Sequence, residues 1–127
     1  MGYRIIIYDD DQDILLVTAA ILEMKGHTVT GREHCRAMEE DLSVFNPDVV
    51  LMDNWLPDMG GVKAIQYIKS NPAFKNIPVI FFSANSNVEQ LAAEAGADYM
   101  LKKPFEIAGL QQLIEKAVTG TPVGSEN

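Results

Sequence analysis

PDVVLMDNWLPDMGG, residues 47–61, contains a short apolar run that ends at a carboxylate, Asp53, and is followed by turn-forming residues. The apolar run extends from Val49 to Met52 and has turn formers on both sides, which is typical of a strand buried on both faces in a parallel sheet. Open α/β sheets bind ligands at the carboxyl ends of their strands, so Asp53 stands where a functional group is expected. A lone aspartate at this position more often starts a turn, and the rest of the chain decides between the two roles.

Strand-like and helix-like segments alternate on both sides of this run. The expected strands cover residues 4–8, 27–30, 49–52, 78–83 and 97–102, and the expected helices cover residues 12–25, 33–42, 62–69, 88–95 and 106–118. The helices are predicted from apolar residues at helical spacing, such as Ile107, Leu110 and Ile114 in the last helix. Five successive βα units predict an α/β fold in which one doubly wound parallel sheet has helices on both faces.

The 127 residues are 47% hydrophobic and 22% charged, the composition of one ordinary globular domain with a full core. The formal net charge of −8 argues against nucleic acid or a membrane surface as a direct partner. Cys35 is the only cysteine, which excludes an internal disulfide and favours a cytoplasmic setting with a buried thiol. The first residues lack an apolar run long enough for a signal peptide. We expect a domain at residues 1–118, followed at 119–127 by a flexible tail or a truncated linker.

Polar residues follow or end four of the five expected strands. Asp9 and Asp10 follow the first strand, Asp53 follows the third, Ser83 ends the fourth, and Lys103 follows the fifth. Because the carboxyl ends of parallel strands meet at one edge of a sheet, we expect these side chains to converge. Two carboxylates at about 4 Å repel each other by roughly 4 kcal/mol at an effective dielectric constant of about 20. Such a cluster favours a bound cation, and oxygen ligands on short turns suit Mg²⁺.

These groups suggest chemistry on a phosphoryl group. Together with one Mg²⁺ and the ammonium of Lys103, the three carboxylates sum to zero charge. A phosphoryl group at Asp53 would meet the metal, the Lys103 ammonium and the Ser83 hydroxyl. Asp53 is therefore predicted to be a nucleophile that forms an aspartyl phosphate.

Four motifs carry a resemblance to a known family. They are IIIYDDD, VVLMDNWLPDMGG, PVIFFSA and GADYMLKKPF, and they end strands one, three, four and five in that order. With these motifs, residues 4–118 resemble the receiver domain of two-component response regulators and are chemotaxis-regulator-like. The resemblance implies a flavodoxin-like three-layer sandwich with strand order 2-1-3-4-5. It also implies a phosphorelay signalling module and not an enzyme such as a general phosphatase, with slow self-dephosphorylation as its one hydrolytic reaction.

The resemblance assigns the phosphoacceptor and its neighbours. Asp53 would be phosphorylated by a sensor histidine kinase or a phosphotransfer protein. Ser83 matches the switch position, and Lys103 is the matching lysine because it directly precedes Pro104, which follows a cis peptide bond in the family. Phosphorylation would favour a pre-existing minor state, change the surface offered to an output partner, and could produce a homodimer.

The resemblance also assigns the metal ligands. Asp10 and Asp53 would bind Mg²⁺ directly, Asp9 chiefly through water, and Trp55 through its backbone carbonyl. Asp11 is expected to interact with the amino terminus of the following helix and not with the metal.

Met100 departs from the pattern of the family, which usually has an aromatic residue three positions before the lysine. Tyr99 is one step earlier, and one step along a strand reverses the face on which a side chain lies. Two interpretations remain open. Met100 repacks during switching, or it fills space while output runs through the loop after the fourth strand.

Two other functions fit parts of the pattern. A phosphatase or phosphotransferase with an aspartyl phosphate intermediate usually has a second carboxylate two residues after the nucleophile, where this chain has Trp55. A flavodoxin-like electron carrier needs a phosphate cradle rich in Gly, Ser and Thr, whereas the loop after the first strand is acidic. Trp55 is expected to be an exposed loop aromatic, and His27 and His34, which lack partners at metal-ligand spacing, are expected at the surface.

Overall fold

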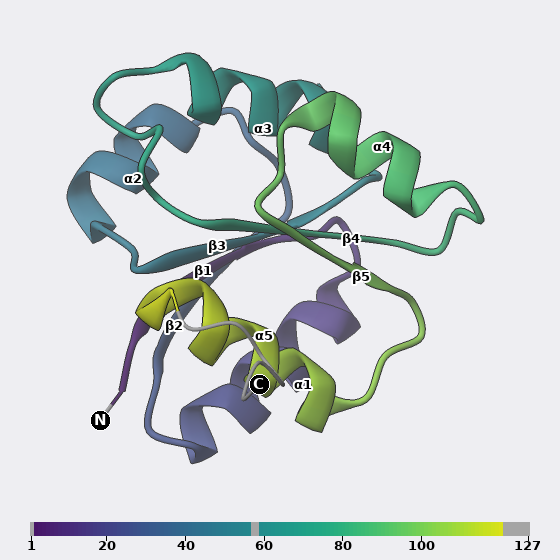
Figure 1. The fold of residues 1–127 in the computed structure, drawn as a ribbon. Helices are drawn as coiled ribbons and strands as arrows, with labels where there is room; N and C mark the ends of the chain where they lie inside the picture. The colour runs from purple at the N-terminus through teal and green to yellow at the C-terminus, as the bar shows by residue number, and fades with distance from the viewer. Residues whose placement is uncertain (1, 57–58, 121–127) are drawn as a thin grey trace.

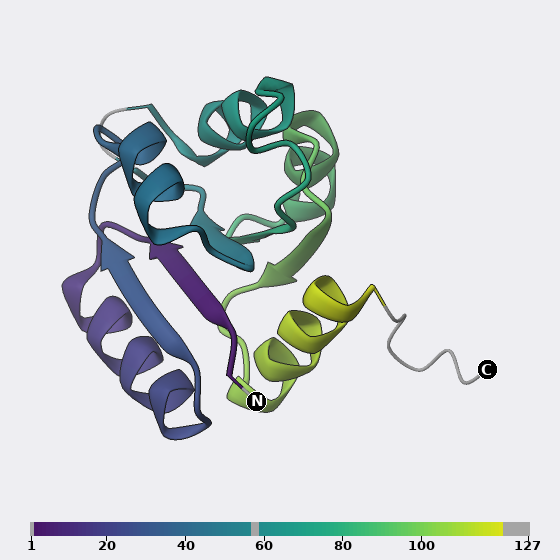
Figure 2. The same ribbon diagram turned by 90° about the vertical axis from the view of Figure 1, so that its left-hand side faces the viewer.

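In the computed structural model, which describes residues 2–56 and 59–120, five parallel strands form one sheet with the order β2-β1-β3-β4-β5. The strands are β1 (Arg4–Tyr8), β2 (Thr28–Arg32), β3 (Val49–Asp53), β4 (Val79–Ser83) and β5 (Tyr99–Lys102). The helices are α1 (Gln12–Met24), α2 (Met38–Phe45), α3 (Gly61–Ser70), α4 (Val88–Ala95) and α5 (Ile107–Thr119). Helices α2, α3 and α4 cover one face of the sheet, and α1 and α5 cover the other (Figures 1 and 2). The predicted doubly wound fold and strand order are confirmed.

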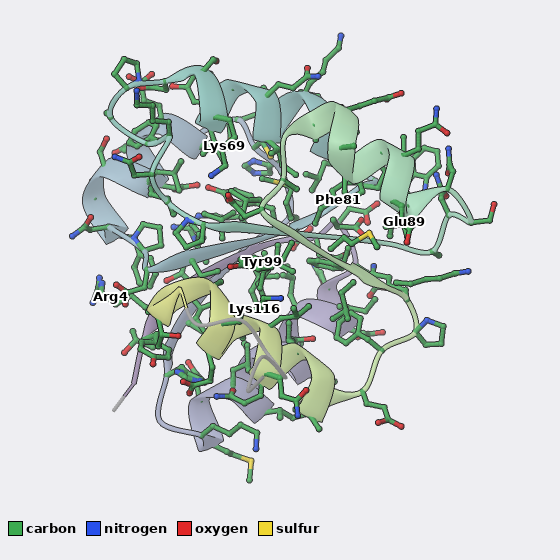
Figure 3. The ribbon with its side chains drawn as sticks, in the orientation of Figure 1. Arg4, Lys69, Phe81, Glu89, Tyr99 and Lys116 are labelled. Atoms are coloured by element: carbon green, nitrogen blue, oxygen red, sulfur yellow. The ribbon has the colours of Figure 1, made fainter. Side chains whose placement is uncertain are left out.

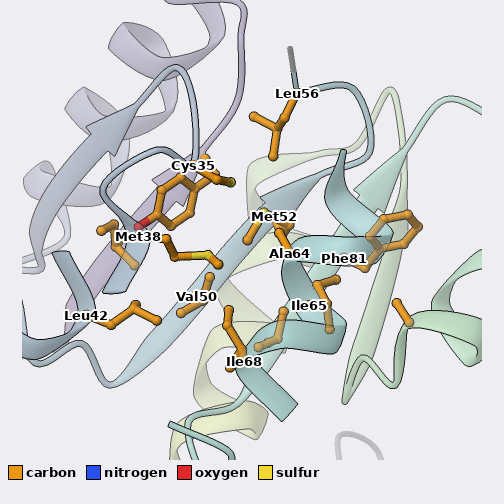
Figure 4. Close-up of a cluster of buried hydrophobic side chains, with 14 of the residues drawn as sticks. Cys35, Met38, Leu42, Val50, Met52, Leu56, Ala64, Ile65, Ile68 and Phe81 are labelled. Carbon is orange, nitrogen blue, oxygen red and sulfur yellow. The ribbon is translucent and has the colours of Figure 1, made fainter. Parts of the chain in front are cut away.

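The central strand β3 is buried along its whole length. Val50 and Met52 pack into the hydrophobic cluster beneath α2, α3 and α4, part of which Figure 4 shows. Val49 and Leu51 point to the opposite face and pack into the cluster beneath α1 and α5. A strand with core on both faces needs apolar residues at every position, and this is why the run in the sequence is continuous and does not alternate.

The first helix begins where the sequence predicts, but the second does not. The carboxylate of Asp11 accepts the backbone N–H groups of Asp13 and Ile14 and thereby caps α1. The predicted helix at residues 33–42 is wrong in its first half, because α2 begins at Met38. Cys35 and Met38 are both buried and three residues apart, which imitates helical spacing, but a turn joins them instead. Strand β2 also extends two residues further than predicted because it pairs with the whole of β1.

His27 is not at the surface as expected, since only 6% of it is exposed. Its Nδ1 accepts the backbone N–H of Tyr3 at 3.0 Å, and its ring stacks on the Tyr3 ring. Its Nε2 lies 3.1 Å from Oε1 of Gln111 on α5. The histidine is therefore part of the packing between the beginning of the sheet and α5.

Helix α5 ends at Thr119, one residue beyond the predicted domain boundary, and Gly120 follows it in a left-handed conformation. Residues 121–127, which make up most of the predicted tail, lie outside the described residues. None of the helices in the described ranges combines the length and the apolar character needed to cross a membrane.

Candidate functional site

Three charged residues from separate strand ends meet at the carboxyl end of the sheet: Asp53 is the last residue of β3, Asp9 follows β1 and Lys103 follows β5. The Nζ of Lys103 lies 2.8 Å from Oδ1 of Asp53 and 3.1 Å from Oδ2 of Asp9. Both carboxylates are buried, whereas the Lys103 side chain keeps 19% of its surface exposed. The neighbouring Lys102 is exposed in β5. The structure thus holds one ammonium between two carboxylates that are far apart in the sequence.

The second oxygen of each buried carboxylate accepts a backbone hydrogen bond. Oδ2 of Asp53 accepts the N–H of Trp55 at 3.0 Å, and Oδ1 of Asp9 accepts the N–H of Asp11 at 2.9 Å. Each aspartate therefore forms a local turn with the residue two positions later. These turns fix the direction in which both carboxylates face Lys103.

The electrostatics of the site favour a bound cation. Burial raises the pKa of Asp53 and the neighbouring Asp9 raises it further, although the hydrogen bond from Lys103 acts in the opposite direction. Burial lowers the pKa of Lys103, but its contacts with Asp53 and Asp9 outweigh this effect, so that its pKa is raised overall. Lys103 therefore remains an ammonium at neutral pH. The carboxylates of Asp9, Asp10 and Asp53 together with Lys103 leave a charge of −2, which one divalent cation would balance.

Asp9, Asp10 and Asp53 each offer a carboxylate oxygen, and these oxygens lie within 4.8 Å of one another. Asp10 is exposed, whereas Asp9 and Asp53 are buried. Three hard oxygen donors, one of them accessible from solvent, fit a hydrated divalent cation. The Trp55 side chain is 66% exposed, as expected, and its backbone carbonyl remains a predicted ligand.

Ser83 and Pro104 lie beside this cluster. The buried Oγ of Ser83 accepts the N–H of Asn85 at 3.0 Å, and that contact leaves the hydroxyl hydrogen free to be donated. The backbone carbonyl of Ser83 accepts the N–H of Lys103 at 2.9 Å, which ties the end of β4 to the turn after β5. The peptide bond between Lys103 and Pro104 is cis.

Tyr99 and Met100 face opposite sides of the sheet. Met100 packs against the cluster that contains Phe81, on the side of α4. Tyr99 packs on the side of α5, and Figure 3 labels both Tyr99 and Phe81. The Nζ of Lys116 lies 5.3 Å from the centre of the Tyr99 ring. Tyr99 therefore does not take the place of an aromatic at position 100.

Gly61 supports the site and was not singled out in the sequence. A Cβ at this position would clash with the carbonyl oxygen of Asp53, and the N–H of Gly61 donates to the carbonyl of Asn54 at 3.0 Å. The preceding Gly60 has a φ of 81°. The Gly60-Gly61 pair could have indicated this position from the sequence alone, since close backbone approach and positive φ both favour glycine.

An apolar groove with a volume of about 580 Å³ lies next to the site, between α1 and the beginning of α5. Lys103 lies on its wall, so the groove reaches the charged cluster. The apolar side chains that line it are Ile14, Val17, Ile21, Ala84, Pro104, Phe105 and Ile107.

Comparisons with known proteins agree with this geometry. Residues 5–115 match the model of the response regulator receiver domain family. The chain is 33% identical over 115 residues to the DNA-binding transcriptional regulator NtrC of Proteus hauseri, an alignment that covers 89% of this chain and 24% of NtrC. It is 35% identical over 106 residues to the CAI-1 autoinducer sensor kinase/phosphatase CqsS of Vibrio cholerae, covering 81% of this chain and 16% of CqsS.

A solved structure is also similar. It is the receiver domain of a sensor histidine kinase from Pseudomonas aeruginosa PAO1, described with a magnesium ion coordinated in its active-site cleft. Its TM-score is 0.85 at 26% identity, and the match covers 94% of this chain and 99% of that one. By contrast, the chain spans only a quarter or less of the length of NtrC and CqsS.

Proposed function

This chain belongs to the response regulator receiver domain family of two-component systems, and we propose that Asp53 is the residue on which it accepts a phosphoryl group. The observation that supports this assignment best is the position of Lys103, whose ammonium joins Asp53 to Asp9 at 2.8 and 3.1 Å. A lysine held in this way is next to the oxygens on which negative charge develops during phosphoryl transfer.

In the proposed reaction, a carboxylate oxygen of Asp53 attacks the phosphorus of a phosphohistidine. The new P–O bond forms as the P–N bond breaks, and the released imidazole nitrogen keeps the electron pair and takes up a proton from water. Lys103 then places its ammonium against a phosphoryl oxygen, and the free hydroxyl hydrogen of Ser83 is donated to another. These two movements change the backbone around Ser83 and Lys103, which are already joined by a hydrogen bond.

Asp9, Asp10, Asp53 and the backbone carbonyl of Trp55 would hold Mg²⁺, with Asp9 acting chiefly through water. When bound, the ion supplies neutralisation of the charge on the phosphoryl oxygens. The donor set supports this choice because it consists of oxygens only and is partly open to solvent.

We propose a sensor histidine kinase or a phosphotransfer protein in the cytoplasm as the donor. The apolar groove beside Lys103 supports a protein donor, because an apolar surface next to the phosphoacceptor offers binding energy that a small phosphate compound does not need. Phosphorylation would then switch binding of an output partner or a homodimer contact through Ser83 and Met100.

Intact mass after incubation with acetyl phosphate tests the proposal. The wild type is expected to gain one phosphoryl group only when Mg²⁺ is present, and Asp53→Asn is expected to gain none. Asp48→Asn is the matched control, because Asp48 caps the opposite end of the sheet through the N–H of Arg4 and should be phosphorylated like the wild type. A phosphoryl group on Asp53→Asn, or no gain by the wild type with Mg²⁺, would contradict the assignment.

A further inference from the structure

Lys103 reaches its two carboxylates across the face of an aromatic ring. Its Nζ lies 4.9 Å from the centre of the Phe82 ring, and Phe82 is only 3% exposed. An ammonium at this distance is attracted to the negative face of the ring, and the attraction increases where water is excluded. Lys103 therefore has a third partner besides Asp9 and Asp53.

The surroundings of Phe82 hold its ring in this position. Phe82 pairs with Asp53 across β3 and β4, and its carbonyl accepts the N–H of Asn54 at 3.2 Å. The ring of Phe105 packs edge-on against it, with ring centres 5.9 Å apart and an interplanar angle of 82°. The Phe82 ring thus lies in the same cross-strand row as the proposed phosphoacceptor, and Phe105 packs against it.

The ring differs from the carboxylates in one respect that matters for phosphoryl transfer. A divalent cation held by Asp9 and Asp53 would compete with Lys103 for the negative charge of these carboxylates, and its own charge would repel the ammonium. Phe82 carries no net charge and coordinates no metal, so its attraction for Lys103 persists when the cation is bound.

We propose that Phe82 is a positioning residue for phosphoryl transfer, whose ring holds the Lys103 ammonium beside Asp53 while a cation occupies the carboxylates. This role rests on the proposed function of Asp53 as the phosphoacceptor. Phe82 itself touches neither the phosphoryl group nor the metal, and it acts only through Lys103.

Fluorinated phenylalanines test the proposal, because successive fluorine atoms weaken the negative face of the ring with little change in its size. With one, two and three fluorines at position 82, the rate of phosphorylation by acetyl phosphate at saturating Mg²⁺ is expected to fall stepwise. With three fluorines it should be about tenfold below the wild-type rate. The same series at Phe81 is the control, since Phe81 is equally buried in β4 but packs on the opposite face of the sheet. The Phe81 series is expected to keep the wild-type rate.

A second measurement needs neither metal nor phosphate. In the metal-free protein, the ring should shift the proton resonances of the Lys103 ε-methylene upfield, and Phe82→Leu should abolish this shift. Equal rates throughout the Phe82 series, or the same decline in the Phe81 series, would overturn the role of Phe82 in a protein that is still phosphorylated. A wild type that gains no phosphoryl group would overturn the proposed function as well, so the two failures are distinguishable.

Discussion

Tyr8 directly precedes the acidic pair Asp9 and Asp10 and is fully buried. Its surroundings disfavour ionisation of its hydroxyl group. Its hydroxyl donates to Oδ2 of Asp41 at 3.0 Å, and the other Asp41 oxygen lies 3.3 Å from Nε of Arg32. Burial, followed by the charge of Asp41, raises the pKa of Tyr8 far above its ordinary value of 10.0. An unfolded chain therefore loses this proton at a lower pH than the folded protein does.

We expect Tyr8→Phe to reduce the loss of stability at alkaline pH. Above pH 10.0 the unfolded wild type binds fewer protons at this site than the folded form, so the free energy of unfolding falls as the pH rises. At neutral pH the variant should be less stable by about 1–2 kcal/mol, because Asp41 loses a buried donor. Urea denaturation at about pH 7 and about pH 11 gives the free energy of unfolding of both proteins. The difference between the wild type and the variant should be smaller at the higher pH. A constant difference would show that Tyr8 ionises normally in the folded state.

At the scale of elements, the position of Asp53 depends on how closely α3 approaches the end of β3. Gly61 begins α3 and has room for no side chain, because the carbonyl oxygen of Asp53 occupies that space. Gly109 lies inside α5 with open space around its Cβ position. A methyl group added at Gly61 would therefore clash with the backbone, whereas one added at Gly109 would meet open space.

We expect Gly61→Ala to lower the free energy of unfolding by about 1–3 kcal/mol and to slow phosphorylation by acetyl phosphate, because the backbone that carries Asp53 must shift. Gly109→Ala is the control and should raise the free energy of unfolding by up to about 1 kcal/mol, since alanine favours the helix. Denaturant titrations and intact-mass time courses on both variants make the comparison. Equal behaviour of the two would mean that the close approach at Gly61 has no effect on the site.

At the scale of the whole molecule, the groove between α1 and α5 is the surface that we propose for a protein donor, and it lies beside Asp53 without including it. Val17 is 58% exposed on the groove, whereas Val44 is 76% exposed on α2, on the opposite face of the sheet. Lysine at Val17 would place a solvated charge on the apolar wall, while lysine at Val44 would leave that wall unchanged.

We expect Val17→Lys to slow transfer from a phosphorylated histidine phosphotransfer protein by about tenfold relative to its rate from acetyl phosphate. Val44→Lys should keep the wild-type ratio of the two rates. Rapid-mixing measurements with both donors provide that ratio. If both variants kept the wild-type ratio, the donor would bind elsewhere on the molecule.

The sequence by itself determined the order of the elements, the central strand and the rim where the charged residues meet. A continuous apolar run is enough to identify a strand with core on both faces, and parallel strands necessarily bring Asp9, Asp53 and Lys103 to the same edge. The role of Asp11 at the start of α1 could also be predicted, because a helix cap acts within one turn of its own residue and depends only on local sequence.

Only the tertiary structure decided which side chains meet across large separations in the chain. His27 is buried against Tyr3 and Gln111, Phe82 lies under Lys103, and β2 extends along the whole of β1. Local periodicity reports which face of an element is apolar, but it carries no information about the residue that another element places opposite. That choice depends on strand register and on how the helices pack over the sheet, and both are settled only when the whole chain folds.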